Sequence, residues 1–184
     1  MIDTSVVAII SSPRKGGNTD TIVSAMADAA AANGKDVKKY YLNPLTNKKG
    51  CQGCNACKKT GKCVTKDDLT PILEDIKAAD GIIVSSPVYF GEACGQYRLL
   101  EDRYFGFLDG SFKPSFAPGK KVAVVTSCGT AGADELVQKM TNVFVNFFGA
   151  ESVGTIAFKG GNPPDAAKND KKIMAMAEEI GKKF

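Results

Sequence analysis

Two hydrophobic patterns alternate along the chain. Short, continuous apolar runs predict buried strands, and longer segments whose apolar residues recur every three or four positions predict helices. Four such runs are expected to form strands: Ser5–Ile10, Gly81–Ser85, Lys121–Thr126 and Val153–Phe158. Val37–Leu42, which contains two lysines, is also expected to form a strand. Because most of these runs carry few polar positions, they indicate a parallel sheet that is covered on both faces.

Segments with helical periodicity follow the predicted strands. The most regular one closes at Gly149 and has an apolar stripe formed by Leu136, Met140, Val143, Phe144 and Phe147. The other four are predicted as helices over Asn18–Asn33, Asp67–Ala79, Gly95–Tyr104 and Asp165–Lys183. Alternating strands and helices are typical of an α/β fold. The length suits a single domain over 1–184, with an irregular, cysteine-rich segment at 43–64 inserted after the second strand.

Composition narrows the chemistry of this α/β chain. It contains no histidine, which excludes Ser-His-Asp and Cys-His nucleophile systems and zinc sites built on histidine. The composition therefore favours an enzyme whose reaction is carried out by a bound cofactor. The net charge of +4 comes from scattered lysines and does not favour a nucleic-acid partner. Without a signal peptide or an apolar run near the roughly 20 residues that span a bilayer, we expect a cytoplasmic protein with no membrane partner.

The first predicted strand is followed by the loop S-S-P-R-K-G-G-N-T at 11–19, which opens the first helix. Backbone N–H groups and the dipole at a helix N-terminus attract a phosphate. Gly16 and Gly17 allow close backbone approach, and Arg14 adds positive charge. The loop matches neither the G-x-G-x-x-G dinucleotide fingerprint nor the G-x-x-x-x-G-K-[ST] triphosphate loop. It predicts an anion site, with an ordinary polar loop and helix cap as the alternative.

Two further loops follow the third and fourth predicted strands. Ser85–Gly91 contains two adjacent aromatic residues that could pack a planar ring, although strand ends also bury aromatics against the next helix. Thr126–Gly132 is short and rich in small, hydrogen-bonding residues. Ligands of open α/β sheets bind outside the carboxyl ends of the strands, so we expect all three loops to meet there.

The three loops, together with Asp102-Arg103 after the following helix, resemble the flavodoxin-like NAD(P)H-dependent FMN reductases over nearly the whole chain. The resemblance implies a three-layer sandwich with a five-stranded parallel sheet in the order 2-1-3-4-5. It implies that the FMN phosphate is held by Ser11, Pro13, Arg14, Gly17, Asn18 and Thr19. The residues expected to wrap the isoalloxazine are Pro87, Val88, Tyr89, Phe90 and Gly91. Those expected beside the ring or the ribityl chain are Ser127, Cys128 and Gly129.

Four cysteines form the pattern C-x2-C-x2-C-x5-C: Cys51, Cys54, Cys57 and Cys63. Runs of this kind bring several thiolates to a common centre and commonly hold iron–sulfur cubes. Tetrahedral zinc, a dithiol switch and unligated thiols are the alternatives. The pattern also resembles the compact motif of iron–sulfur flavoproteins, a branch of the same family. That resemblance implies an oligomer in which electrons pass between a [4Fe–4S] cluster and FMN.

The leading functional interpretation is an FMN-dependent oxidoreductase. Its electrons would come from NAD(P)H or from a redox protein such as ferredoxin, and the family resemblance implies a homo-oligomer, a dimer or tetramer. No side chain is assigned as catalytic, because a flavin carries the chemistry itself. A non-enzymatic electron carrier of flavodoxin type and a zinc-stabilised interaction protein are the alternatives.

Overall fold

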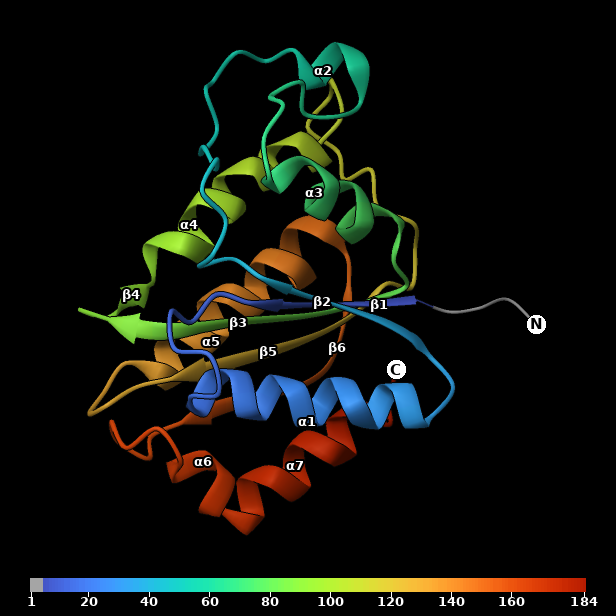
Figure 1. The fold of residues 1–184 in the computed structure, drawn as a ribbon. Helices are drawn as coiled ribbons and strands as arrows, with labels where there is room; N and C mark the ends of the chain where they lie inside the picture. The colour runs from blue at the N-terminus through green and yellow to red at the C-terminus, as the bar shows by residue number, and fades with distance from the viewer. Residues whose placement is uncertain (1–4) are drawn as a thin grey trace.

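The computed structural model describes residues 5–184, and a parallel sheet lies at its centre (Figure 1). Its strands are β1 (Ser5–Ile10), β2 (Asp36–Tyr41), β3 (Gly81–Tyr89), β5 (Lys121–Ser127) and β6 (Glu151–Phe158). They pair in the order β2-β1-β3-β5-β6, which confirms the predicted order 2-1-3-4-5. The two-residue strand β4 (Glu92–Ala93) pairs antiparallel with the end of β3.

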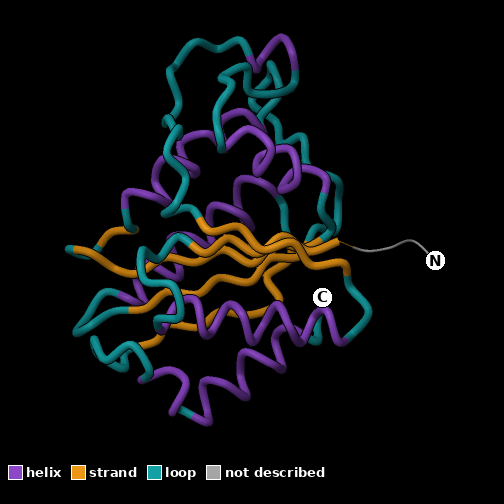
Figure 2. The backbone as a smooth tube through the Cα atoms, viewed as in Figure 1, coloured by secondary structure: helices purple, strands orange, loops and turns teal. Residues whose placement is uncertain are grey.

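Helices cover both faces of the sheet (Figures 1 and 2). On one face lie α1 (Asn18–Ala32), α6 (Ala166–Asn169) and α7 (Lys171–Gly181). On the other lie α3 (Leu69–Ala78), α4 (Gly95–Asp102) and α5 (Ala133–Asn142). Over residues 5–184, no helix combines the length and the apolar character that crossing a bilayer requires.

The strand sequences explain the two-sided core. Alternate residues of a strand point to opposite faces, so Val7 and Ile9 of β1 join the core beneath α3, α4 and α5. Val6 and Ile10 join the core beneath α1 and α7. The strand β2 lies at the edge of the sheet, and its residues are polar because they are exposed or only partly buried. Lys38 of β2 forms an ion pair with Asp75 of α3.

The third strand is longer than its apolar run indicates. It was predicted to end at Ser85, but β3 continues to Tyr89 and pairs with β5 as far as Pro87. The hydroxyl of Ser85 donates to the carbonyl of Ile9 (2.7 Å), and Ser86 accepts the N–H of Cys94 (2.9 Å). Internal hydrogen bonds therefore allow these polar residues to continue a buried strand.

Two predicted helices change geometry along their length. The helix predicted to end at Tyr104 is α-helical only to Asp102 and continues as the 3₁₀-helix η1 (Arg103–Phe107). Helix α5 passes into a π-helical turn, η2 (Val143–Phe147). The prediction that Phe147 lies on the buried stripe is wrong, because this side chain is 65% exposed and Phe148 is buried instead. A π turn holds more residues than an α turn, so the buried face shifts along the sequence.

The last predicted helix and the cysteine-rich segment also differ from expectation. Asp170 divides the segment from Asp165 to Lys183 into α6 and α7, because its carboxylate caps the N-terminus of α7. The segment at 43–64, which we call the cysteine segment, is not wholly irregular. It contains the helical turn α2 (Cys57–Thr60) and projects beyond α3 and α4 (Figure 1).

Candidate functional site

The predicted loops meet at one pocket. The carboxyl ends of β1, β3 and β5 lie at the same edge of the sheet, as parallel strands with these pairings require. The pocket at this edge, which we call the sheet-edge pocket, is lined by Ser12, Arg14, Asn18, Thr19, Pro87, Val88, Tyr89, Ser127, Cys128, Gly129, Gly161 and Asn162. All three predicted loops therefore contribute to it.

A buried hydroxyl pair joins two of these loops at the pocket. Thr19, in the first turn of α1, and Ser127, at the end of β5, place their side-chain oxygens 2.6 Å apart. Both residues are almost fully buried. The contact holds the start of α1 against the end of β5. In the sheet, β3 lies between β5 and β1, the strand that leads into α1.

The start of α1 has the character of an anion site. Gly17 precedes the helix and provides no side-chain cap, so the N–H groups of the first turn keep their donor capacity. Arg14 lies on the same loop and lines the pocket. A Cβ at Gly17 would lie 3.0 Å from the Cβ of Arg14 and 3.2 Å from its carbonyl oxygen. The tight turn that presents Arg14 therefore depends on glycine at 17.

An acidic side chain supports the same loop from behind. The carboxylate of Asp20 accepts the N–H of Gly16 (2.7 Å) and also the hydroxyls of Ser24 and Tyr41. Burial and the neighbouring Asp20 carboxylate raise the pKa of Tyr41. The neutral phenol is therefore retained as a donor, and it holds β2 to the start of α1.

Several predicted residues lie beside the pocket rather than in its lining. Ser11 is fully buried, and its hydroxyl donates to the carbonyl of Ser85 at 2.5 Å. Pro13 and Gly17 form the turn, and Phe90 and Gly91 form the tip of the β3–β4 hairpin. Phe90 is fully exposed and has a φ of 53°.

The loop after β6 contributes residues that the sequence reasoning missed. Gly161 and Asn162 line the pocket, and Arg14 donates to the carbonyl of Asn162 (2.9 Å). The side chain of Asn18 donates to the carbonyl of Pro163 (2.9 Å) and accepts the N–H of Ala167 (2.9 Å). The signal available was G-G-N-P after the fifth strand, at the same sheet edge as the other loops.

The loop after β5 contains two glycines that lie close to neighbouring side chains, and Gly129 lines the pocket. A Cβ at Gly129 would approach the side chain of Asn162 to between 3.3 and 3.5 Å. Gly132 has a φ of 93°, and a Cβ there would lie 3.1 Å from Val88. A side chain at 132 would therefore be strained and would press on Val88, whereas a side chain at 129 would need only a small shift of Asn162.

The four cysteines line a second pocket, within the cysteine segment. Cys51 and Cys54 are exposed, Cys57 is buried and Cys63 is intermediate, and all four are free thiols. The residues that complete the lining include Val64, Thr65, Arg103, Phe105 and Gly106. Among the described residues, no three Cys, Asp or Glu side chains converge as a single metal ion requires.

A doubly wound parallel sheet with a polar pocket at the carboxyl ends of β1, β3 and β5 defines a protein of the flavodoxin-like class. Residues 4–163 match the NADPH-dependent FMN reductase family, and the chain belongs to that family. It is an FMN reductase-like flavoprotein oxidoreductase.

Similar proteins agree with this assignment. An iron-sulfur flavoprotein of Methanocaldococcus jannaschii is 35% identical over 189 residues, covering 97% of this chain and 94% of the relative. An iron-sulfur flavoprotein of Methanosarcina thermophila is 30% identical over 182 residues, covering 97% and 92%. The crystal structure of an azoreductase from Bacillus anthracis superposes with a TM-score of 0.69 at 18% identity, covering 98% and 100%, and shares the fold.

Proposed function

We propose that FMN binds in the sheet-edge pocket, with its phosphate at the loop 11–19 and its ring against 87–91. The observation that carries the proposal is the convergence of loops from β1, β3 and β5 on one pocket. The uncapped first turn of α1 and the guanidinium of Arg14 suit a phosphate, which needs N–H donors and positive charge. The contacts of the other predicted residues with FMN stay predictions.

The chain's own residues orient the cofactor and limit its exposure. Arg14 balances phosphate charge, while the Thr19–Ser127 hydroxyl pair fixes two walls of the pocket. Pro87 and Val88 offer an apolar surface to a flat ring, and Tyr89 is 46% exposed at the rim. When bound, FMN supplies hydride acceptance and electron release in single or paired steps. The family name favours NADPH as the donor.

We further propose that the four cysteines hold a [4Fe–4S] cluster that exchanges electrons with FMN. All four line one pocket, and two relatives that cover nearly the whole chain are named iron-sulfur flavoproteins. A single zinc ion needs ligands that converge on one point, whereas a four-iron cube is held by thiolates spread around it.

The flavin assignment is tested by equilibrium FMN binding. Thr19→Val removes the hydroxyl at the pocket while keeping the side-chain volume, and we expect about a tenfold weaker affinity, the size of one lost hydrogen bond to a charged group. Thr21→Ala is the control, because Thr21 lies outside the lining of the pocket. Failure of the wild-type protein to bind FMN would overturn the flavin proposal.

The cluster assignment is tested by anaerobic purification with assays of iron, zinc and acid-labile sulfide. We expect iron and sulfide in equal amounts, and their loss in Cys57→Ser but not in Cys94→Ser. Cys94 is a matched control because it is buried at the start of α4, outside the cysteine segment. Zinc without sulfide identifies the zinc alternative and contradicts the cluster.

A further inference from the structure

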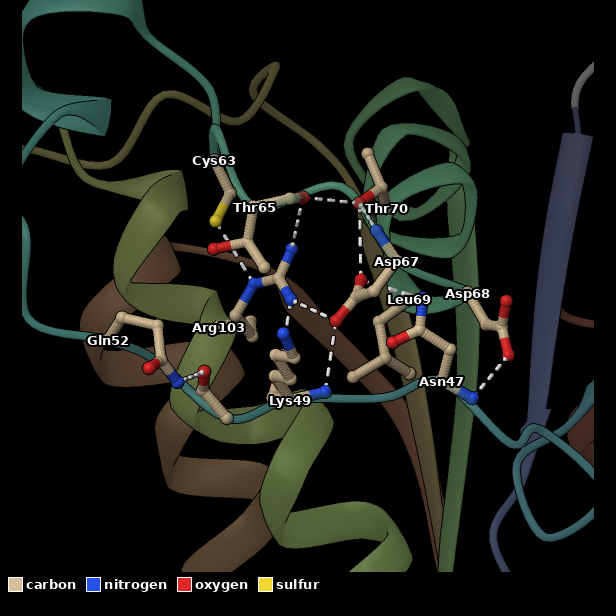
Figure 3. A network of polar contacts seen from close by, with 11 residues as sticks. Asn47, Lys49, Gln52, Cys63, Thr65, Asp67, Asp68, Leu69, Thr70 and Arg103 are labelled. Carbon is tan, nitrogen blue, oxygen red and sulfur yellow. Dashed lines mark hydrogen bonds and ion pairs between the residues drawn. The ribbon is translucent and has the colours of Figure 1, made fainter.

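Arg103 buries a guanidinium beneath the cysteine segment (Figure 3). Its side chain has no exposed surface, and neither has that of its ion-pair partner Asp67. A buried charge is costly unless it is paired and hydrogen-bonded. The guanidinium meets this requirement with four acceptors: Cys63 Sγ at 3.0 Å, Lys49 O at 3.1 Å, Asp67 Oδ2 at 2.9 Å and Thr65 O at 3.3 Å.

These acceptors lie on both sides of the cysteine run. Lys49 precedes the first cysteine by two residues, and Thr65 follows the last by two. Asp67 strengthens the arrangement, because its Oδ2 also accepts the N–H of Lys49 (2.9 Å). Its Oδ1 accepts the N–H of Leu69 (3.1 Å), at the start of α3. One ion pair therefore ties both ends of the run to α3 and to the end of α4.

Cys63 receives a different donor from the other cysteines. Nε of Arg103 donates to its sulfur, whereas Cys51 receives only the weaker backbone N–H of Gly53 at 3.5 Å. A charged donor stabilises electron density on sulfur more than a neutral one does. Hydrogen bonds to ligand sulfurs are among the features that set cluster reduction potentials.

We propose that Arg103 is a positioning residue that orders the cysteine run before metal arrives and raises the reduction potential of the cluster through Cys63. The second half of this proposal rests on the proposed cluster. A merely structural guanidinium would stabilise the segment without changing the potential, so the potential separates the two roles.

The first test compares Arg103→Lys with Arg98→Lys after anaerobic cluster reconstitution. Lysine keeps a positive charge beside Asp67 but cannot reproduce the fork that reaches four acceptors. Arg98 is the matched control, because it is an exposed arginine of α4, the helix that leads into η1 and Arg103, and it pairs with Glu101. The measurements are iron and sulfide content, FMN affinity, and the cluster potential from a spectroscopic redox titration.

We expect Arg103→Lys to lower the reduced-to-oxidised ratio at a fixed potential about tenfold, equivalent to ~59 mV for one electron. Arg98→Lys should match the wild type. Loss of the cluster from Arg103→Lys alone, with normal FMN affinity, would also support positioning. A full cluster at the wild-type potential in Arg103→Lys would overturn the proposal.

The second test needs no metal and separates this inference from the proposed cluster. If the wild-type protein takes up neither iron nor sulfide, the cluster proposal fails, and Arg103 is judged by hydrogen exchange of the metal-free chain. Arg103→Met combined with Asp67→Asn leaves no unpaired buried charge. We expect at least tenfold faster exchange over 49–67 and unchanged exchange over 18–32. Unchanged exchange over 49–67 would overturn the positioning role.

Discussion

At the scale of single residues, Lys120 is a buried lysine whose ammonium group lies close to an aromatic ring. The residue is 3% exposed, and its Nζ donates to the carbonyl of Ile76 (3.1 Å), at the end of α3, and lies 5.2 Å from the centre of the Phe116 ring. Burial lowers the pKa of this amine to about 8, and the negative charge of Asp80 opposes the shift only partly. Lys120 therefore links the protonation state of the protein to its stability.

The lowered pKa predicts a stability that rises with pH. Between about pH 8 and 10.5 the folded state releases this proton while the unfolded chain retains it, so the free energy of unfolding increases. Relative to Lys120→Met, the wild type should gain about 1 kcal/mol between pH 7 and 9.5, after a discount for screening. Urea unfolding at the two pH values measures the difference.

Lys120→Arg is the control for this titration. Its guanidinium stays charged across the same range, so its stability relative to Lys120→Met should not change with pH. An equal rise in the Arg and Lys proteins would assign the effect to other groups.

At the scale of elements, Asp170 shows how one side chain sets a helix boundary. Its Oδ1 accepts the N–H groups of Lys172 (3.0 Å) and Ile173 (3.1 Å) at the start of α7. We expect Asp170→Ala to lower the free energy of unfolding by about 1 kcal/mol, the usual cost of losing a helix cap. Asp165→Ala is the matched comparison, because Asp165 precedes α6 without a side-chain cap and should cost less. Equal losses would contradict the capping role.

The helices and strands also show how much of the fold could be predicted from the sequence. Apolar runs located β1, β3, β5 and β6, because burial on both faces demands them, whereas the edge strand β2 is polar. The order of the five strands followed from the family resemblance. The extension of β3 past Ser85 could not be foreseen, because it depends on hydroxyl bonds to Ile9 and Cys94. Likewise, the exposure of Phe147 depends on a π turn, and no residue of η2 is a sequence signal for such a turn.

The candidate site was predictable to the same degree. Three loops were expected at one sheet edge, and they line one pocket. The part played by 161–162 was missed, because it depends on where the loop after β6 folds back onto Arg14 and Asn18. The buried role of Arg103 was also invisible, since its partners are separated from it by 36 to 54 residues.

At the scale of the whole molecule, charge is distributed unevenly. Residues 43–66 contain no acidic residue and six lysines: Lys48, Lys49, Lys58, Lys59, Lys62 and Lys66. Several of them are exposed, including Lys59 and Lys62. Residues 43–66 therefore present a positive surface, and a surface of one sign accelerates encounters with partners of the opposite sign.

This distribution predicts salt-dependent electron uptake from an acidic redox protein such as a ferredoxin. The second-order rate constant, measured by stopped flow, should fall at least about tenfold from low to high ionic strength. Lys59→Glu with Lys62→Glu should lower it further at low salt. The same reversal at Lys168 and Lys171, on the other face of the sheet, should have little effect. A rate constant that does not change with ionic strength would exclude electrostatic steering.

Because one guanidinium reaches carbonyl oxygens of both Lys49 and Thr65, the two ends of the cysteine run lie next to each other. Residues 50–64 thus leave and re-enter the body of the protein at almost one point, so a short linker can join 49 to 65. Within the run, Lys58 donates to the carbonyls of Phe105 and Leu108, and removing these contacts lowers stability. A chain in which ~3 glycines replace 50–64 should fold and bind FMN with unchanged affinity. Unchanged FMN affinity in this chain would show that the proposed flavin site does not depend on the cysteine run, and the shortened protein would then exchange electrons through flavin alone.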